Sequence, residues 1–251
     1  MSASKLYQKI KNYINRRKAR KIKTDVNIPL KRLGGDATDS SVIYLDDLSK
    51  KQNIIIYVAG IGEEINFELA LLRELENKNV QMFAFDPTPK SAEFVKKLDL
   101  PDNFHFYPYA IVDVDKPVEF ALPRNEGWVS GSCEDVKDDS RQFDFYNKII
   151  VEGRSLSSIM QQLGHDHIDL LKMDIEGSEF VALNNVFSEH LAISQITLDY
   201  HDYMFDDGQD KLKHLLSKIK MSDYAIYYVE QDFNKNQNLG LLQKASYNLK
   251  E

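Results

Sequence analysis

The densest group of reactive side chains in this sequence directly follows an apolar run at Ile168–Met173. Three carboxylates, those of Asp174, Glu176 and Glu179, stand there within six residues. Carboxylates gathered at the end of a strand can hold a proton, orient a substrate or bind a divalent cation. A plainer interpretation is that Asp174 caps the next helix and that a glutamate meets the positive end of that helix. The pattern alone leaves both interpretations open.

A histidine stands at the end of the next apolar run. This run, Ser194–Leu198, leads into Asp199 and His201. If the two runs are neighbouring parallel strands, His201 and Asp174 lie over the same crevice, because ligands bind beyond the carboxyl ends of such strands. A histidine placed there can act as a general base. A lone histidine is equally often a structural residue.

Two glycines and an acid form a candidate nucleotide site earlier in the chain. The apolar run Asn53–Val58 leads into Gly60 and Gly62, where missing Cβ atoms let the backbone turn tightly beside a ligand. Asp86 ends the following run, 24 residues after Gly62, which is the spacing typical of an acid that binds ribose hydroxyls. Acidic residues, beginning with Glu63, follow in place of a third glycine and disfavour a pyrophosphate. The alternatives are a purely structural turn and a helix cap.

Strand-like and helix-like segments alternate along most of the chain. Short apolar runs predict strands at 53–58, 80–85, 104–107, 168–173, 194–198, 225–229 and 239–243. Apolar residues at helical spacing predict helices at 67–75, 87–98, 156–163, 180–187 and 211–219. No helix separates the last two strands, which indicates an antiparallel pair. The fold class is therefore α/β, with a mostly parallel sheet of about seven strands and an antiparallel terminal strand pair.

Residues 112–150 interrupt this alternation. The segment 118–122 predicts an antiparallel excursion, and the polar stretch from Trp128 to Asp144 predicts a long loop. Loops of that length in a compact domain are usually functional or mobile. Its aromatic side chains could stack on a substrate ring or form the private core of the loop; they are Trp128, Phe143, Phe145 and Tyr146.

Charge and composition divide the chain into two parts. The net charge is −7, yet residues 1–23 carry nine lysines or arginines and no acid. We expect residues 1–45 to form a basic helix and linker that could contact an anionic membrane surface or an acidic partner. Residues 46–251 would form one acidic domain, which argues against nucleic-acid binding. One cysteine, Cys133, and no evident signal peptide or membrane span indicate a soluble cytoplasmic protein.

The segment Asp169–Phe180 resembles the hallmark of the FkbM-type methyltransferase family. Gly60–Glu64 and Phe85–Pro87 fall where that family has its first glycine motif and its acidic ribose ligand. The resemblance implies a Rossmann-like methyltransferase fold, S-adenosylmethionine as cofactor, and O-methylation of a small hydroxylated substrate such as a sugar, glycan or polyketide. It assigns cofactor binding to the following residues: Gly60, Gly62, Glu63, Asp86 and Ala110.

For methyl transfer to a hydroxyl, we expect His201 to take the proton while Asp174 and Glu176 orient the substrate or His201. No metal is needed in this version. A less favoured variant has Asp174, Asp199 and His201 holding a divalent ion that acidifies the hydroxyl. Two rival functions stay open: an NAD-dependent oxidoreductase, because Asp86 would bind that ribose equally well, and a non-catalytic nucleotide-binding module on the same fold.

Overall fold

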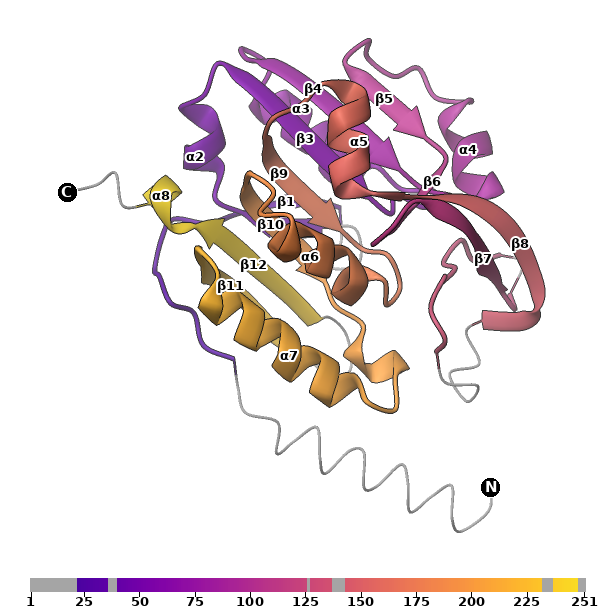
Figure 1. The fold of residues 1–251 in the computed structure, drawn as a ribbon. Coiled ribbons are helices and arrows are strands. Elements are labelled where there is room, and N and C mark those ends of the chain that lie inside the picture. The colour runs from indigo at the N-terminus through magenta and orange to yellow at the C-terminus, as the bar shows by residue number, and fades with distance from the viewer. Residues whose placement is uncertain (1–21, 36–39, 126, 137–142, 232–236, 248–251) are drawn as a thin grey trace.

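The computed structural model describes residues 22–35, 40–125, 127–136, 143–231 and 237–247, with only the backbone described at 143–146. Its centre is a seven-stranded sheet in the order β11-β12-β10-β9-β3-β4-β5 (Figure 1). The strands are β3 (Asn53–Ala59), β4 (Asn79–Phe85), β5 (Phe104–Tyr107), β9 (Ile168–Met173), β10 (Ile193–Asp199), β11 (Tyr224–Gln231) and β12 (Gln237–Gln243).

The predicted topology is confirmed. Strands β5, β4, β3, β9 and β10 pair in parallel, and β12 lies antiparallel to both β10 and β11. The central strands read as nearly continuous apolar runs because helices cover the sheet on both faces. The chain crosses between strands through helices, so the carboxyl ends of β3, β4, β9 and β10 all reach the same edge of the sheet.

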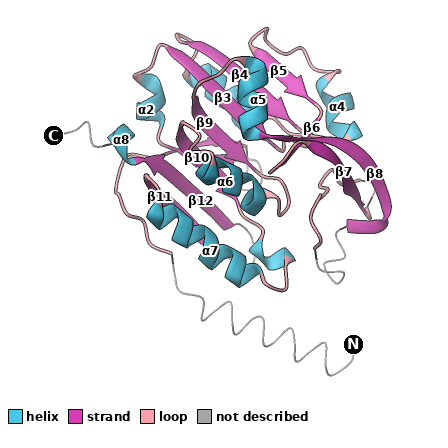
Figure 2. Cartoon of the chain, in the orientation of Figure 1, coloured by secondary structure: helices cyan, strands magenta, loops and turns pink. Residues whose placement is uncertain are grey.

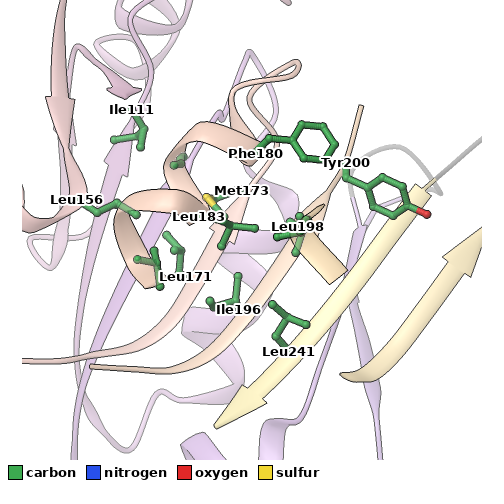
Figure 3. Close-up of a cluster of buried hydrophobic side chains, with 14 of the residues drawn as sticks. Ile111, Leu156, Leu171, Met173, Phe180, Leu183, Ile196, Leu198, Tyr200 and Leu241 are labelled. Atoms are coloured by element: carbon green, nitrogen blue, oxygen red, sulfur yellow. The ribbon is translucent and has the colours of Figure 1, made fainter. Parts of the chain in front are cut away.

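Two helical layers pack on the sheet (Figure 2). The first contains α5 (Leu156–Leu163), α6 (Glu179–Ser188) and α7 (Gly208–Met221), and the second contains α2 (Leu45–Ser49), α3 (Asn66–Glu74) and α4 (Pro89–Val95). In the first layer, Leu156 and Leu183 contact the same buried cluster as Leu171 and Ile196 of the sheet (Figure 3). The α4 helix begins as predicted, with Thr88 as its N-cap.

One long strand was not predicted from the sequence. Strand β8 (Phe143–Ser155) begins at the last two residues of the predicted loop and is the middle strand of a three-stranded sheet with β6 (Tyr109–Val112) and β7 (Lys116–Pro123). The predicted excursion at 118–122 lies in β7 and pairs antiparallel with β8. The sequence of β8 did not predict a strand, because one side of it faces solvent and carries polar residues. Its backbone hydrogen bonds are made to β6 and β7, which no local pattern reveals.

The residues before position 46 pack on the domain instead of forming only a linker. Strands β1 (Lys31–Gly34) and β2 (Ser40–Ile43) pair antiparallel, and they bury Leu33 and Ile43 in the same cluster as Phe67 of α3. The predicted basic helix lies outside the described residues. The remaining elements are a short 3₁₀ helix at Asp202–Met204 and α8 (Lys244–Tyr247). Within the described ranges, no helix combines the length and the apolar character that crossing a membrane requires.

Candidate active site

A cavity of about 410 Å³ opens at the carboxyl ends of β3, β4 and β9. Seven of the eight predicted site residues line it: Gly60, Gly62, Glu63, Asp86, Ala110, Asp174 and Glu176. The eighth, His201, is 5% exposed and lies behind the wall that Asp174 and Glu176 form. Residues scattered over more than a hundred positions therefore meet at one place, where an open α/β sheet binds its ligands.

The glycine loop lies directly against the end of β9. Gly60 has a φ of +82°, and a Cβ built on it would stand 1.8 Å from the carbonyl oxygen of Asp174. Gly60 N donates to Phe85 O at 2.9 Å, and Asp174 N donates to Ala59 O at 2.9 Å. Only glycine allows this approach, so the loop and the acidic segment form one continuous cavity floor.

Asp86 fastens the glycine loop to the start of α4. One carboxylate oxygen accepts hydrogen bonds from Ile61 N at 3.1 Å and Gly62 N at 3.0 Å. The other accepts from Thr88 N at 2.9 Å and from its hydroxyl at 2.6 Å. Thr88, and not Asp86, caps the helix. Asp86 therefore shapes the cavity, and its contact with a ribose stays a prediction.

The segment after β9 is held in an unusual backbone conformation by Glu179. Glu176 has a φ of +52° and Gly177 a φ of +104°. Glu179 is fully buried, and its two carboxylate oxygens accept from Ile175 N at 2.9 Å and Gly177 N at 3.0 Å. This arrangement turns the Asp174 and Glu176 side chains toward the cavity. From the sequence, Glu179 was only one of three nearby carboxylates, and its buried role was missed.

His201 is surrounded by carboxylates. Its Nδ1 lies 2.9 Å from Glu179 Oε1, and its Nε2 lies 3.5 Å from Glu176 Oε2 and 3.7 Å from Asp174 Oδ1. The pairing of β10 with β9 produces this meeting, as the strand-neighbour argument predicted. We call the four side chains Asp174, Glu176, Glu179 and His201 the carboxylate–imidazole cluster.

Burial and mutual charge shift the proton affinities of this cluster. Burial would lower the pKa of His201, but the carboxylates of Glu179 and Glu176 hold it well above 6.5. Enclosure raises the pKa of both Asp174 and Glu176, although the charge of His201 opposes the rise. The Asp174 side chain is 40% exposed, and it lines the cavity. Burial, aided by the charge of Asp174, raises the pKa of Asp199 to about 7.

A second charged pair lies in the cavity wall and was not predicted from the sequence. Lys172 lies on β9, two residues before Asp174, and lines the cavity. Its Nζ stands 3.0 Å from Glu68 Oε1. Glu68 lies on α3 and is fully buried. Its other oxygen, Oε2, has no hydrogen-bond partner among the residues that the structure describes. An isolated Lys or Glu in a strand or helix carries no local signal for a pairing 104 residues apart.

The outer wall comes from the segment between β7 and β8. Ser130, Gly131 and Cys133 line the cavity, and burial raises the pKa of the Cys133 thiol to about 12, which fits an unreactive thiol. Trp128 does not line the cavity and is 50% exposed. The side chains of the other predicted stacking residues, Phe143, Phe145 and Tyr146, lie outside what the structure describes.

One group of side chains has the composition of a metal site. Ligand atoms of Asp174, Glu179 and His201 lie within 4.8 Å of one another. Asp199, a ligand in the metal variant considered from sequence, is not part of this group. Both oxygens of Glu179 already accept backbone hydrogen bonds, and one also contacts His201. The first oxygen is thereby filled, and a metal at the second would compete with the bond from Gly177 N, so the group fits a metal poorly.

Comparison with known proteins gives a family match. The model of the methyltransferase FkbM domain matches residues 57–226. The 2-O-methyltransferase NoeI of Sinorhizobium fredii is 27% identical over 145 residues, covering 54% of this chain and 60% of that protein. Probable methyltransferase-like protein 24 of Homo sapiens is 23% identical over 193 residues, covering 72% of this chain and 44% of that protein. The chain thus spans less than two thirds of either curated relative.

Among solved structures, the crystal structure of an FkbM methyltransferase from Methylobacillus flagellatus aligns with a TM-score of 0.47. The two share 13% identity, over 76% of this chain and 44% of that one. The family match covers the glycine loop, Asp86 and the whole carboxylate–imidazole cluster. The chain belongs to the FkbM methyltransferase family.

Proposed function

We propose that this protein is an S-adenosylmethionine-dependent O-methyltransferase that acts on a hydroxyl of a small molecule, with a sugar or glycan as the favoured acceptor. The observation that carries the proposal is the joining of two features in one cavity. A glycine-edged nucleotide pocket around Gly60, Gly62 and Asp86 shares its wall with the carboxylate–imidazole cluster. Family membership and the O-methyltransferase among the relatives support the same reaction class.

The charge of the cavity favours this cofactor over NAD. Five carboxylates line the described wall: Glu63, Glu64, Asp86, Asp174 and Glu176. S-adenosylmethionine carries a sulfonium and an ammonium, which acidic surroundings attract. A pyrophosphate would be repelled by the same carboxylates, and Glu63 occupies the place where it would need open backbone N–H groups.

The residues present fit the cofactor. The close approach of Gly60 to Asp174 leaves a backbone cradle that a Cβ would fill. We assign Gly60, Gly62, Glu63, Asp86 and Ala110 to cofactor binding, with Asp86 accepting from ribose hydroxyls. Because Asp86 already accepts four hydrogen bonds, its ribose contact would share or replace the bonds to the glycine loop.

When bound, the cofactor supplies an electrophilic methyl group. The protein has to align the acceptor hydroxyl and receive its proton, and alignment alone can contribute about 7–11 kcal/mol. Asp174 and Glu176 face the cavity and would contact the hydroxyl directly. His201 lies behind them, and its raised pKa means that the ring already holds its proton. Asp174 or Glu176 would therefore take the hydroxyl proton, in place of the direct role for His201 expected from the sequence, and the positive charge of His201 would stabilise these carboxylates. Glu179 would hold the imidazole in place.

The proposal also covers the partners and the location of the protein. The acidic body disfavours nucleic acid as a partner. The basic segment at residues 1–23 would contact an anionic membrane surface or an acidic partner; residues 1–21 of it lie outside the described part of the chain. A cytoplasmic location is proposed from the single cysteine alone.

Calorimetric titration of the full chain with S-adenosylhomocysteine and, separately, with NAD tests the cofactor. We expect the first to bind and the second not to; binding of NAD alone would overturn the proposal. Methyl transfer from labelled S-adenosylmethionine is then measured over a panel of sugars, glycans and polyketide alcohols.

The catalytic assignment is tested with a matched pair of histidine variants. His201→Ala should lower turnover by roughly 10²- to 10⁴-fold, whereas His214→Ala, on the exposed face of α7, should change nothing. Cofactor binding with no turnover on any acceptor, and no effect of His201→Ala, would favour the binding module.

A further inference from the structure

We propose that Lys172, paired with Glu68, is the binding site for the carboxylate at the amino-acid end of the cofactor. This inference rests on the proposed function, since it names a contact to S-adenosylmethionine. It concerns a residue that does not belong to the glycine loop, to Asp86 or to the carboxylate–imidazole cluster.

The charge of the cavity demands a cation for that carboxylate. The described lining carries five carboxylates and a single basic side chain, that of Lys172. The carboxylates of the cavity attract the ammonium and the sulfonium of the cofactor, but they would repel its carboxylate. Lys172 is the lining residue that can compensate this repulsion with a charge-assisted hydrogen bond.

Lys172 is placed where the glycine loop, α3 and β9 converge. It lies opposite Val58 in the β3–β9 register, two residues before Asp174. Its Nζ stands 5.2 Å from the centre of the Phe67 ring, its side chain is 12% exposed, and the residue lines the cavity. The ammonium is therefore fixed in position and still reachable from the cavity.

Glu68 explains how this cation is retained in a largely buried position. Removing a lone ammonium from water is costly, and a fully buried carboxylate at 3.0 Å offsets much of that cost. An ammonium donates three hydrogen bonds, so it can serve Glu68 and a second carboxylate together. A ligand carboxylate would thus join an existing pair without forcing it apart.

The experiment compares two ligands that differ in one group. The full chain is titrated calorimetrically with S-adenosylhomocysteine and with its decarboxylated analogue, which keeps the adenosine, sulfur and amine. We expect the wild type to prefer S-adenosylhomocysteine by about 10- to 100-fold, the worth of one charge-assisted hydrogen bond. Lys172→Met should remove that preference by weakening S-adenosylhomocysteine alone, and Lys172→Arg should retain part of it.

A lysine outside the cavity provides the control. Lys90 donates to the backbone oxygen of Trp128 and does not line the cavity, so Lys90→Met should leave both affinities unchanged. A wild type without the preference overturns the inference even if Lys172→Met fails to fold, and leaves the proposed function standing. A preference that persists in Lys172→Met overturns it as well and leaves the pair a structural one. If neither ligand binds, the proposed function fails and the inference fails with it.

Discussion

The two ends of β9 carry similar charged side chains, but only those at the carboxyl end line the cavity. At the amino end, Asp169 is 2% exposed, and its two oxygens accept from Lys51 Nζ at 2.8 Å and Ile55 N at 2.7 Å. At the carboxyl end, Glu68 accepts from Lys172 but keeps one oxygen without a hydrogen bond among the described residues. His201 Nε2 likewise stands 3.5 Å or more from its nearest carboxylates.

This difference separates structural charges from functional ones. A buried ion pair whose hydrogen-bonding capacity is filled contributes to folding and offers a ligand nothing. A charged group that lines the cavity can instead be reached by a ligand, as Lys172, Asp174 and Glu176 can at the carboxyl end. We therefore predict that substitutions at the amino end act on stability and that those at the carboxyl end act on binding and turnover.

The largest expected effect concerns two glycines with positive φ. Gly60→Ala would push a Cβ into the carbonyl oxygen of Asp174, 1.8 Å away, so we expect loss of the folded cavity, with more than about 3 kcal/mol of stability lost. Gly164, which ends α5 before β9, has a φ of +70°, and a Cβ added there would meet nothing within 4 Å among the described residues. Gly164→Ala should cost only about 1 kcal/mol.

Urea unfolding and S-adenosylhomocysteine titration of both variants measure this contrast. Gly164→Ala should bind the ligand normally, because its strain is local to the helix end. Equal stability losses in the two variants would mean that the backbone at Gly60 can relax away from β9, and the continuous cavity floor would then be wrong.

The next effect compares two aspartates at opposite ends of the same strand. Asp169→Asn should lower the free energy of unfolding by about 1.5 to 3 kcal/mol, because Lys51 keeps its ion pair with Asp47 but loses the charge-assisted hydrogen bond to the nearly buried Asp169. Asp174→Asn should change stability by less than about 1 kcal/mol. Enclosure raises the pKa of Asp174, so folding already disfavours its charge. The effect of Asp174→Asn should appear in turnover, which we expect to fall by at least about 10²-fold.

Denaturant unfolding and methyl-transfer assays on both variants separate these outcomes. Asp169→Asn that still folds should keep its affinity for S-adenosylhomocysteine. If Asp169→Asn reduced turnover at unchanged stability, or Asp174→Asn unfolded the protein, the division between the two ends of β9 would not hold.

Most of the central sheet was predictable because each of its strands has a recognisable local pattern of apolar residues. Runs such as Asn53–Val58 are buried on both faces, and the absence of a helix between the last two strands indicated their antiparallel pairing. Strand β8 was not predictable, since solvent covers one side of it and its pairing partners in β6 and β7 lie far away in the chain. The same holds for β1 and β2, whose burial depends on α3.

The sequence predicted which residues form the candidate site, but it did not predict the contacts among them. Strand ends identify Asp86, Asp174 and His201, because parallel strands bring their carboxyl ends together. That His201 lies behind the acids, and that Glu179 is buried beneath them, depends on the turn at Glu176 and Gly177. No local pattern reports such a turn for a non-glycine residue. The Lys172–Glu68 pair was hidden for the same reason: it is purely tertiary.

The smallest expected effect is that of removing metal ions. Asp174, Glu179 and His201 could supply ligand atoms, but Glu179 uses one oxygen for Ile175 N and the other for Gly177 N. Those bonds hold the turn that presents Asp174 to the cavity, so a metal taking Glu179 would dismantle its own site. We therefore expect turnover to stay within about twofold after exhaustive chelation.

Chelation thus tests whether the charged groups at the carboxyl end of β9 bind substrate and cofactor directly or bind a metal ion. Turnover is measured before and after treatment with excess EDTA, with metal content determined in both samples. Loss of activity that one divalent ion restores would make the cluster a metal centre and Glu179 a ligand. Unchanged activity would mean that the positive charge of His201, and not a metal ion, balances Asp174 and Glu176. The charged groups at this end of the strand would then act on substrate and cofactor, in contrast with Asp169, which acts on folding.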